Sequence, residues 1–387
     1  MVINRIFNQY NLVFLYVIFT LLFPTFIVNK LVFIIIVMIL FSSINSHRLL
    51  SLSPIYVVLI FSYGLFISFF NLVEKNLSYQ FFLSTLSLLI IYPITKHKID
   101  FDKIIKISGL FLALYSLISF VIVVLFVNSP ISEMYYTFFR EYSAGSNGLR
   151  EFTEEGLLSF HTGTAPFLFL SLVLYFESFI SKRNFFTFIV ILLHIYIIFI
   201  GGSRGTFFSA LLAIVFVILF KASNKVKIGF LTIGIPLVLY FISFLLQNTE
   251  IFSSEEGSNN VKLGHFESFL DSTNFFNLLI GNGLGAIYYT KGSGVYKAHT
   301  EITPVDMIRY LGIVMAFLLY WVIIFPTKRI KSYFGNNLLY MIIFLIYVLN
   351  SMTNPTMFNS YGLLVVIWYW YKILKVGEEN FLSKIEA

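Results

Sequence analysis

Long apolar stretches, separated by short polar or charged segments, make up most of the sequence. A helix that crosses a bilayer needs roughly 20 apolar residues and satisfies its own backbone hydrogen bonds, so each stretch predicts a transmembrane helix. The longer stretches are 10–28, 54–72, 104–127, 161–180, 228–246 and 305–325, and the shorter ones are 31–45, 81–94, 185–200, 206–220, 338–350 and 361–374.

The predicted fold class is all-α, a polytopic transmembrane helix bundle of about 12 spans that forms a single integral membrane domain over residues 1–387. The composition agrees, because only 12% of the residues are charged, whereas soluble domains contain about 25%. No small-x-small cleavage site follows the first stretch, so we expect it to be retained as a span. The chain has no cysteine, which excludes disulfides and thiol chemistry.

The charged residues are distributed unequally between the two ends of the predicted spans. If Arg5 is cytoplasmic, 17 of the 26 basic residues and six acidic residues share its side, a balance of +11, and the other side has a balance of −4. Such an excess of lysine and arginine is typical of cytoplasmic loops. The bias predicts that both termini are cytoplasmic, and it explains the basic character of the chain without a nucleic-acid partner.

Two segments on the acidic side, 128–160 and 247–304, are too long to be simple connections. Long loops in compact proteins are commonly functional. In the second segment, apolar residues recur at helical spacing from Phe266 to Ile280, which predicts a helix that lies at the membrane surface. We detect no inverted repeat of the transporter type, which weighs against a carrier.

Two glycine-rich segments are candidates for anion binding. Gly201-Gly202-Ser203-Arg204-Gly205 places an arginine between two short spans, and the planar guanidinium matches phosphate oxygens. The alternative is a hairpin turn whose arginine extends toward the membrane surface. In Gly281-Asn282-Gly283-Leu284-Gly285 the backbone N–H groups form either a nest for an anion or part of a plain turn.

The stretch before and within the span at 305–325 begins with a helix-start signal. Thr303, Pro304 and Asp306 fit the N-cap, first and third positions of a helix in capping-box form, which gives Asp306 a structural role. His299 and Glu301 come just before this helix.

Arg309 follows inside the same helix, about one and a half turns from its start. An imidazole, a carboxylate and a guanidinium are therefore expected to lie close together in space. The alternatives are that Arg309 only pairs with Asp306 at i,i+3 and that His299 is a solvated loop residue.

Asp100-Phe101-Asp102 has the form of the Asp-x-Asp with which nucleotide-sugar transferases hold a metal ion. Four lysines surround it, at positions 96, 98, 103 and 106, so a solvated face paired with lysines is the favoured interpretation. No H-E-x-x-H motif offers another site. We therefore predict that the chain works without a metal and without a cofactor.

Several short segments are informative as a set: 262–269 (KLGHFESF), 280–285 (IGNGLG), 299–303 (HTEIT), 306–312 (DMIRYLG) and 203–204 (SR). Together they resemble bacterial O-antigen polymerases, in the periplasmic loop, the following helix and a Ser-Arg turn of that family. The related O-antigen ligases usually carry His-Asn before the helix, whereas Thr300 follows His299 here, which favours a polymerase.

The resemblance implies a glycosyltransferase of the bacterial inner membrane that takes part in lipopolysaccharide biosynthesis. It would transfer the growing polysaccharide from undecaprenyl diphosphate to a hydroxyl of a new lipid-linked repeat unit at the periplasmic face. The segments 128–160 and 247–304 would then be periplasmic loops. The implied partners are the lipid-linked oligosaccharide and membrane lipid, together with a chain-length regulator and a flippase.

The residues suit this chemistry, because a diphosphate is a good leaving group whose charge must be stabilised. A base must also accept the proton of the acceptor hydroxyl, and Glu301 and His299 are both candidates. The candidate diphosphate ligands are Arg204 and Arg309, with Lys262, His265 and Arg150 as helpers.

Two other functions remain open at this stage. An O-antigen ligase would pass the polymer to the lipid A core, and supplying or omitting that acceptor would identify it. A lipid-linked oligosaccharide flippase would share the spans and the substrate, but it has little use for an outer loop as long as 247–304.

The charge bias and the absence of cysteine make the predicted topology testable. Asn259→Cys, in the second long segment, should react with a membrane-impermeant thiol reagent added to spheroplasts. Asn224→Cys, on the predicted cytoplasmic side, should react only after lysis. Mass spectrometry of the purified protein measures the labelling, and the opposite pattern would reverse the orientation.

Overall fold

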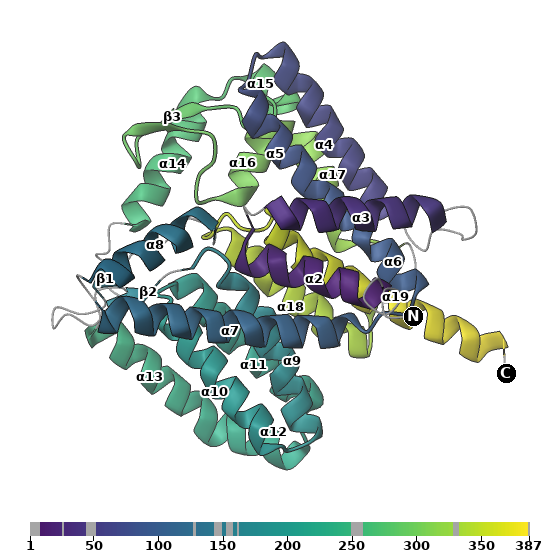
Figure 1. Ribbon diagram of the computed structural model, residues 1–387, viewed down its shortest axis with the longest axis vertical. Helices are drawn as coiled ribbons and strands as arrows, with labels where there is room; N and C mark the ends of the chain where they lie inside the picture. The colour runs from purple at the N-terminus through teal and green to yellow at the C-terminus, as the bar shows by residue number, and fades with distance from the viewer. Residues whose placement is uncertain are drawn as a thin grey trace. The chain divides into compact units, whose positions relative to one another are not determined.

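The computed structural model describes residues 8–24, 27–43, 52–126, 129–142, 149–151, 158–160, 162–248, 258–327 and 333–385. The chain is mostly helical, as the hydrophobic pattern predicts (Figure 1). It divides into two compact units, of which the first comprises residues 1–13, 33–99 and 257–387 and the second residues 14–32 and 100–256.

The first helices in the described part of the chain are α2 (Gln9–Leu22) and α3 (Ile27–Ser43). The first unit then contains α4 (Ser53–Phe70), α5 (Lys75–Thr85), the 3-10 helix η2 (Leu86–Ile90), α6 (Ile91–Lys96), α14 (Ser258–Ser272), α15 (Phe275–Ile280), β3 (Tyr288–Thr290), β4 (Val295–Lys297), α16 (Thr303–Leu311), α17 (Ile313–Ile324), α18 (Asn336–Ser351) and α19 (Ser360–Ile385). The second unit contains α7 (Phe101–Leu125), α8 (Pro130–Tyr142), β1 (Leu149–Glu151), β2 (Leu158–Phe160), α9 (Pro166–Ser181), α10 (Phe185–Ile200), α11 (Arg204–Lys221), α12 (Asn224–Gly229), the π-helical turn η3 (Phe230–Gly234) and α13 (Ile235–Asn248).

Helix α19 is buried over residues 362–371 and packs against α5, η2, α6 and α18 in the first unit. Two of its aromatic side chains also donate hydrogen bonds to backbone carbonyls at the end of α17. Trp370 donates from Nε1 to the carbonyl of Ile323 at 2.8 Å, and the Tyr369 hydroxyl donates to the carbonyl of Ile324 at 2.7 Å. These carbonyls belong to the last turn of a helix, where they have no partner within the helix itself.

Helix α9 has the corresponding position in the second unit, where it packs against α7, α10 and α11 and is buried from Pro166 to Tyr175. His194 of α10 donates from Nδ1 to the carbonyl of Val190 at 2.8 Å, so its Nε2 accepts the hydroxyl of Ser171 at 3.1 Å. Both ring nitrogens therefore have partners, and the pair is a structural contact between the two helices.

Several helices are long and apolar enough to cross a membrane. Within the described residues there are four such segments, Ser53–Phe70, Lys75–Lys96, Phe101–Val124 and Arg204–Lys221, accompanied by shorter apolar helices. Large apolar side chains such as Phe70 and Phe185 are exposed on the surface, as expected for helices in contact with lipid. The number of spans and the outer position of the two long segments stay predictions.

Both long segments contain ordered elements beyond the surface helix that the hydrophobic pattern predicts. The described part of 128–160 holds α8 and a hairpin in which β1 pairs antiparallel with β2. The described part of 247–304 holds α14, α15 and a second hairpin, with Tyr289 of β3 opposite Tyr296 of β4. The expected surface helix is thus two helices, and they expose apolar side chains, including Leu270 and Phe275.

The predicted continuous span 305–325 is wrong in one respect, because the helix breaks at Gly312. This residue separates α16 from α17 with φ = 77° and ψ = 161°, a conformation that residues with a Cβ avoid. A Cβ at this position would also collide with the carbonyl oxygen of Leu279, at the end of α15. The close approach of α15 therefore requires a glycine at position 312. The backbone conformation of this glycine interrupts the helix.

We expect Gly312→Ala to destabilise the fold by more than the backbone strain alone, which is about 1–3 kcal/mol. Gly335→Ala is a matched control, because Gly335 has φ = 72° and ψ = −133° but no atom within 4 Å of the point that a Cβ would occupy. Thermal unfolding of the detergent-solubilised protein measures both changes. Equal losses in the two variants would mean that the contact with Leu279 adds nothing.

Candidate functional site

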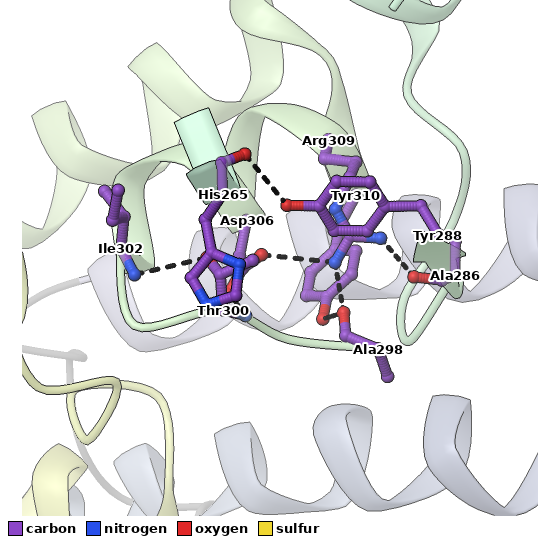
Figure 2. A network of polar contacts seen from close by, with 9 residues as sticks. All are labelled: His265, Ala286, Tyr288, Ala298, Thr300, Ile302, Asp306, Arg309 and Tyr310. Atoms are coloured by element: carbon purple, nitrogen blue, oxygen red, sulfur yellow. Dashed lines mark hydrogen bonds and ion pairs between the residues drawn. The ribbon is translucent and has the colours of Figure 1, made fainter. Parts of the chain in front are cut away.

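Arg309, near the end of α16, is the centre of a buried polar network in the first unit, with 3% of the residue exposed. Its Nη1 donates to the carbonyl of Ala286 and its Nη2 to the carbonyl of Ala298, and Nη2 lies 3.1 Å from Oδ1 of Asp306 (Figure 2). Ala286 precedes β3 and Ala298 follows β4. The guanidinium therefore fastens both ends of the hairpin to α16.

Two tyrosine rings enclose the same guanidinium. Its Cζ lies 4.3 Å from the ring centroid of Tyr288 and 4.6 Å from that of Tyr310, and the Tyr310 hydroxyl also donates to the carbonyl of Ala298. A desolvated cation–π contact contributes about 2 kcal/mol, and a hydrogen bond to a charged group about 1.5–3 kcal/mol. These contacts offset the cost of removing the arginine from water.

Asp306 is structural, as predicted, but the expected capping box is not formed. The helix starts at Thr303 rather than after it, and the Thr303 hydroxyl donates to the carbonyl of Ser351 at 2.8 Å. Oδ2 of Asp306 instead accepts the backbone N–H of Thr300 at 2.7 Å. Together with the ion pair to Arg309, this bond holds the segment in front of α16 against the helix.

The glycine-rich segment 281–285 is a docked turn rather than an anion nest. The N–H groups of Asn282 and Gly283 donate to the carbonyls of Arg309 and Tyr310, at 2.8 and 3.0 Å. Those carbonyls lie in the last turn of α16 and would otherwise have no partner. The N–H of Leu284 donates to a carbonyl of α4 at 3.3 Å. These N–H groups are occupied, so the anion-nest alternative is wrong.

Helix α14 lies close against the turn of the β3–β4 hairpin. A Cβ on Gly264 would come within 2.5 Å of the backbone nitrogen of Gly292, so only a glycine permits this approach. The hydroxyl of Ser268 accepts the N–H of Lys291 at 2.7 Å. The hairpin is thus held at its ends by Arg309 and at its turn by α14.

An ion pair joins α14 to the segment in front of α16. Nζ of Lys262 lies 3.8 Å from Oε2 of Glu301, with side-chain exposures of 24% and 42%. A partly exposed pair of this length contributes at most about 1 kcal/mol. His299, two residues before Glu301, is exposed, with its ring centroid 6.3 Å from that of Phe81.

His265 lies one helical turn after Lys262 and is 1% exposed. Neither ring nitrogen has a hydrogen-bond partner among the described residues, which costs about 1–3 kcal/mol for a buried polar group. Burial, reinforced by the charge of Lys297, lowers the pKa of His265 below 6.5, while Glu301 and Asp306 partly oppose the shift. The imidazole is therefore neutral at pH 7.

The two remaining predicted ligands, Arg204 and Arg150, belong to the second unit. Arg204 is the first residue of α11 and is half-buried, and Ser203 caps this helix by accepting the N–H of Thr206 at 3.4 Å. The tight turn predicted between α10 and α11 is present. Arg150 lies in β1 opposite Ser159, and its side chain is outside the described part of the chain.

Asp100 has a structural role at the start of α7, where its Oδ1 accepts the N–H of Lys103 at 3.1 Å as a helix cap. The sequence favoured a solvated face paired with lysines; Asp100 is exposed, and its carboxylate contacts the backbone rather than the side chain of Lys103. Among the described residues, no group of three or more His, Asp or Glu side chains is placed to hold a metal ion.

No protein-family model matches the chain, and no curated protein matches it. The resemblance to O-antigen polymerases therefore stays a prediction. The geometry brings Lys262, His265, His299 and Glu301 into one region of the first unit, beside the network of Arg309. No sequence pattern indicated Tyr288 and Tyr310, whose rings enclose the guanidinium, because their role depends on the path of the hairpin.

Because Asp306 and Arg309 are buried together, removing either side chain leaves the other charge without its partner. We expect Arg309→Ala and Asp306→Ala each to destabilise the protein by about 3–5 kcal/mol and to reduce the amount of folded protein in the membrane. Arg309→Lys should recover only part, since an ammonium group lacks the fork that reaches both ends of the hairpin.

Membrane abundance and thermal unfolding check this expectation, with Glu267→Ala, which removes an exposed acid of α14, as the control. If Arg309→Ala gave normal abundance but no activity, Arg309 would act on the diphosphate directly.

Proposed function

We propose that the chain is a membrane glycosyltransferase of the O-antigen polymerase type, which transfers a growing glycan from undecaprenyl diphosphate to a new lipid-linked repeat unit at the periplasmic face. The observation that carries the proposal is the set of Lys262, Glu301, His265 and His299 around the start of α16. This set combines a partly accessible cation with groups that can accept a proton. The apolar helices of the chain suit a lipid-linked substrate.

Lys262 is the cation best placed to meet a diphosphate. Its ion pair with Glu301 is long and partly exposed, so a group with two negative charges can replace the carboxylate. Arg309 already donates hydrogen bonds to the carbonyls of Ala286 and Ala298 and forms an ion pair with Asp306. We therefore assign Arg309 to positioning the segment that carries Glu301 and His299, and Lys262 to stabilising the charge of the leaving group.

The transfer itself needs a proton acceptor and a stabilised leaving group. The acceptor hydroxyl loses its proton to a base, and its oxygen forms a bond with the anomeric carbon of the growing chain. The bond between that carbon and the diphosphate oxygen breaks, and the electron pair leaves with the diphosphate. Glu301 and His299 are accessible groups that suit the role of base. Arg204 and Arg150 as diphosphate ligands stay predictions.

The direct test is chain extension by the purified protein in lipid. Given undecaprenyl-diphosphate-linked repeat units alone, it should form a ladder of longer lipid-linked chains, and a chelator should not stop the reaction. Transfer only when lipid A core is supplied would identify a ligase. Movement of the lipid-linked unit across the bilayer without extension would identify a flippase.

The assignment of Lys262 gives a specific prediction. Lys262→Ala should lower chain extension by roughly 10²–10³-fold through lost charge stabilisation, with little change in stability because the ion pair is weak. Lys291→Ala is a matched control, since Lys291 is also ion-paired on the surface of the same unit, with Asp271. Polymer ladders and membrane protein levels measure the effect, and equal activity in both variants would remove Lys262 from the site.

A further inference from the structure

His265 is a buried polar side chain that the fold itself leaves unsatisfied. It is 1% exposed, and neither Nδ1 nor Nε2 has a hydrogen-bond partner among the described residues. Its backbone is well held, because its carbonyl accepts the hydroxyl of Tyr288 at 3.4 Å (Figure 2). The imidazole is therefore buried without a hydrogen bond of its own among the described residues, which makes it a candidate to bond with the substrate.

Charged groups of α14, β4, α16 and the segment before α16 lie near this imidazole. Lys262 lies one turn earlier on the same helix, and Lys297 is at the end of β4. Glu301 lies in the segment before α16 and Asp306 within α16, and both act electrostatically on the ring. Burial is the main reason that the pKa of His265 is lowered, the charge of Lys297 adds to this effect, and the charges of Glu301 and Asp306 oppose it.

A neutral imidazole offers one N–H donor and one nitrogen acceptor. A hydroxyl group can donate a hydrogen bond to the free ring nitrogen, whereas a fully ionised phosphate has no proton to donate. The ring is therefore suited to a sugar hydroxyl, and the adjacent Lys262 to the phosphate of the same reaction. His265 would thus bind the hydroxyl of the substrate, and Lys262 would bind its phosphate.

The Lys262–Glu301 ion pair ties down the segment beside His265. It is 3.8 Å long and partly exposed, so it opens at little cost. A diphosphate that attracts Lys262 would release Glu301, whose charge acts on the imidazole. Binding of the donor would thus make the base available only when the leaving group is in place.

We propose that His265 is the proton acceptor for the acceptor hydroxyl and that the Lys262–Glu301 ion pair covers it until a diphosphate binds. This rests on the proposed function. The hydroxyl proton passes to the free ring nitrogen, the hydroxyl oxygen bonds to the anomeric carbon, and the carbon–oxygen bond to the diphosphate breaks with its electrons. The imidazolium then returns its proton to water. His265 is therefore a catalytic residue, in place of Glu301 or His299.

The first test is the pH dependence of chain extension. The wild-type rate should fall as the pH drops below 6.5, because burial lowers the pKa of His265 and the protonated ring cannot accept a proton. His265→Gln should lower the rate by roughly 10²–10⁴-fold and abolish this acid limb. His97→Gln, which changes an exposed histidine after α6, should leave both unchanged.

Stability measurements separate this role from a structural one. An unsatisfied buried imidazole stabilises nothing that an apolar side chain would not, so His265→Leu should unfold at the same temperature as the wild type or higher while losing extension. A structural role would instead lower the unfolding temperature in proportion to the loss of activity.

The cover is tested without any turnover. Diethyl pyrocarbonate should modify His265 slowly in the free protein and at least several-fold faster with undecaprenyl diphosphate, as read by mass spectrometry of the peptide. Undecaprenol, which lacks the charge, should have no effect. Lys262→Met should expose His265 without any lipid, because it removes the ion pair. Unchanged modification in all of these samples would overturn the cover.

The outcomes distinguish the two proposals. If the wild type does not extend lipid-linked units at any pH, the proposed function fails. If the wild type extends them but His265→Gln keeps the rate and the acid limb, only the assignment of His265 fails. Loss of the acid limb in His299→Gln instead would assign the base to His299.

Discussion

The region around α16 depends on one buried charge, the guanidinium of Arg309. An arginine removed from water must be surrounded by acceptors, and this one obtains them from Asp306 and from the two carbonyls that bracket the β3–β4 hairpin. The path of the hairpin, the position of the segment before α16 and the docking of residues 281–285 all follow from groups that belong to the same helix. Helix α16, through the guanidinium of Arg309, the carboxylate of Asp306 and its last backbone carbonyls, therefore holds together parts of the chain that are far apart in sequence.

This rigid network lies beside a much softer contact. Asp306 and Arg309 are almost fully buried, whereas the Lys262–Glu301 pair is long and partly exposed, so water screens only the second. A site that must hold its geometry yet admit a charged lipid needs both kinds of contact. The proposed chemistry assigns the fixed pair to positioning and the weak pair to exchange with substrate.

The sequence predicts what depends on neighbouring residues and misses what depends on distant ones. The apolar helices follow from local runs of apolar residues, whereas the structural role of Asp306 rests on its bonds with Thr300 and Arg309 and not on the predicted capping box. The break at Gly312 was not predictable, because it depends on the carbonyl of Leu279 in another helix. The capping role of Thr303 was wrong because its hydroxyl finds the carbonyl of Ser351. His265 was proposed as an anion ligand, since its burial without a partner cannot be derived from sequence.

The hydrogen bonds of Arg309 at the base of the β3–β4 hairpin also determine where the chain tolerates changes in length. Arg309 donates to the backbone carbonyls of residues 286 and 298. These two hydrogen bonds do not depend on the number of residues between the carbonyls. Gly294, at the turn, has open space around it, so an insertion there extends outward. In contrast, backbone N–H groups of residues 281–285 donate hydrogen bonds to specific carbonyls of α16 and α4, so a change in length there would break these bonds. Insertions next to Gly294 should therefore be tolerated, whereas insertions at Lys291 or Gly292 would disturb the contacts of the turn with α14.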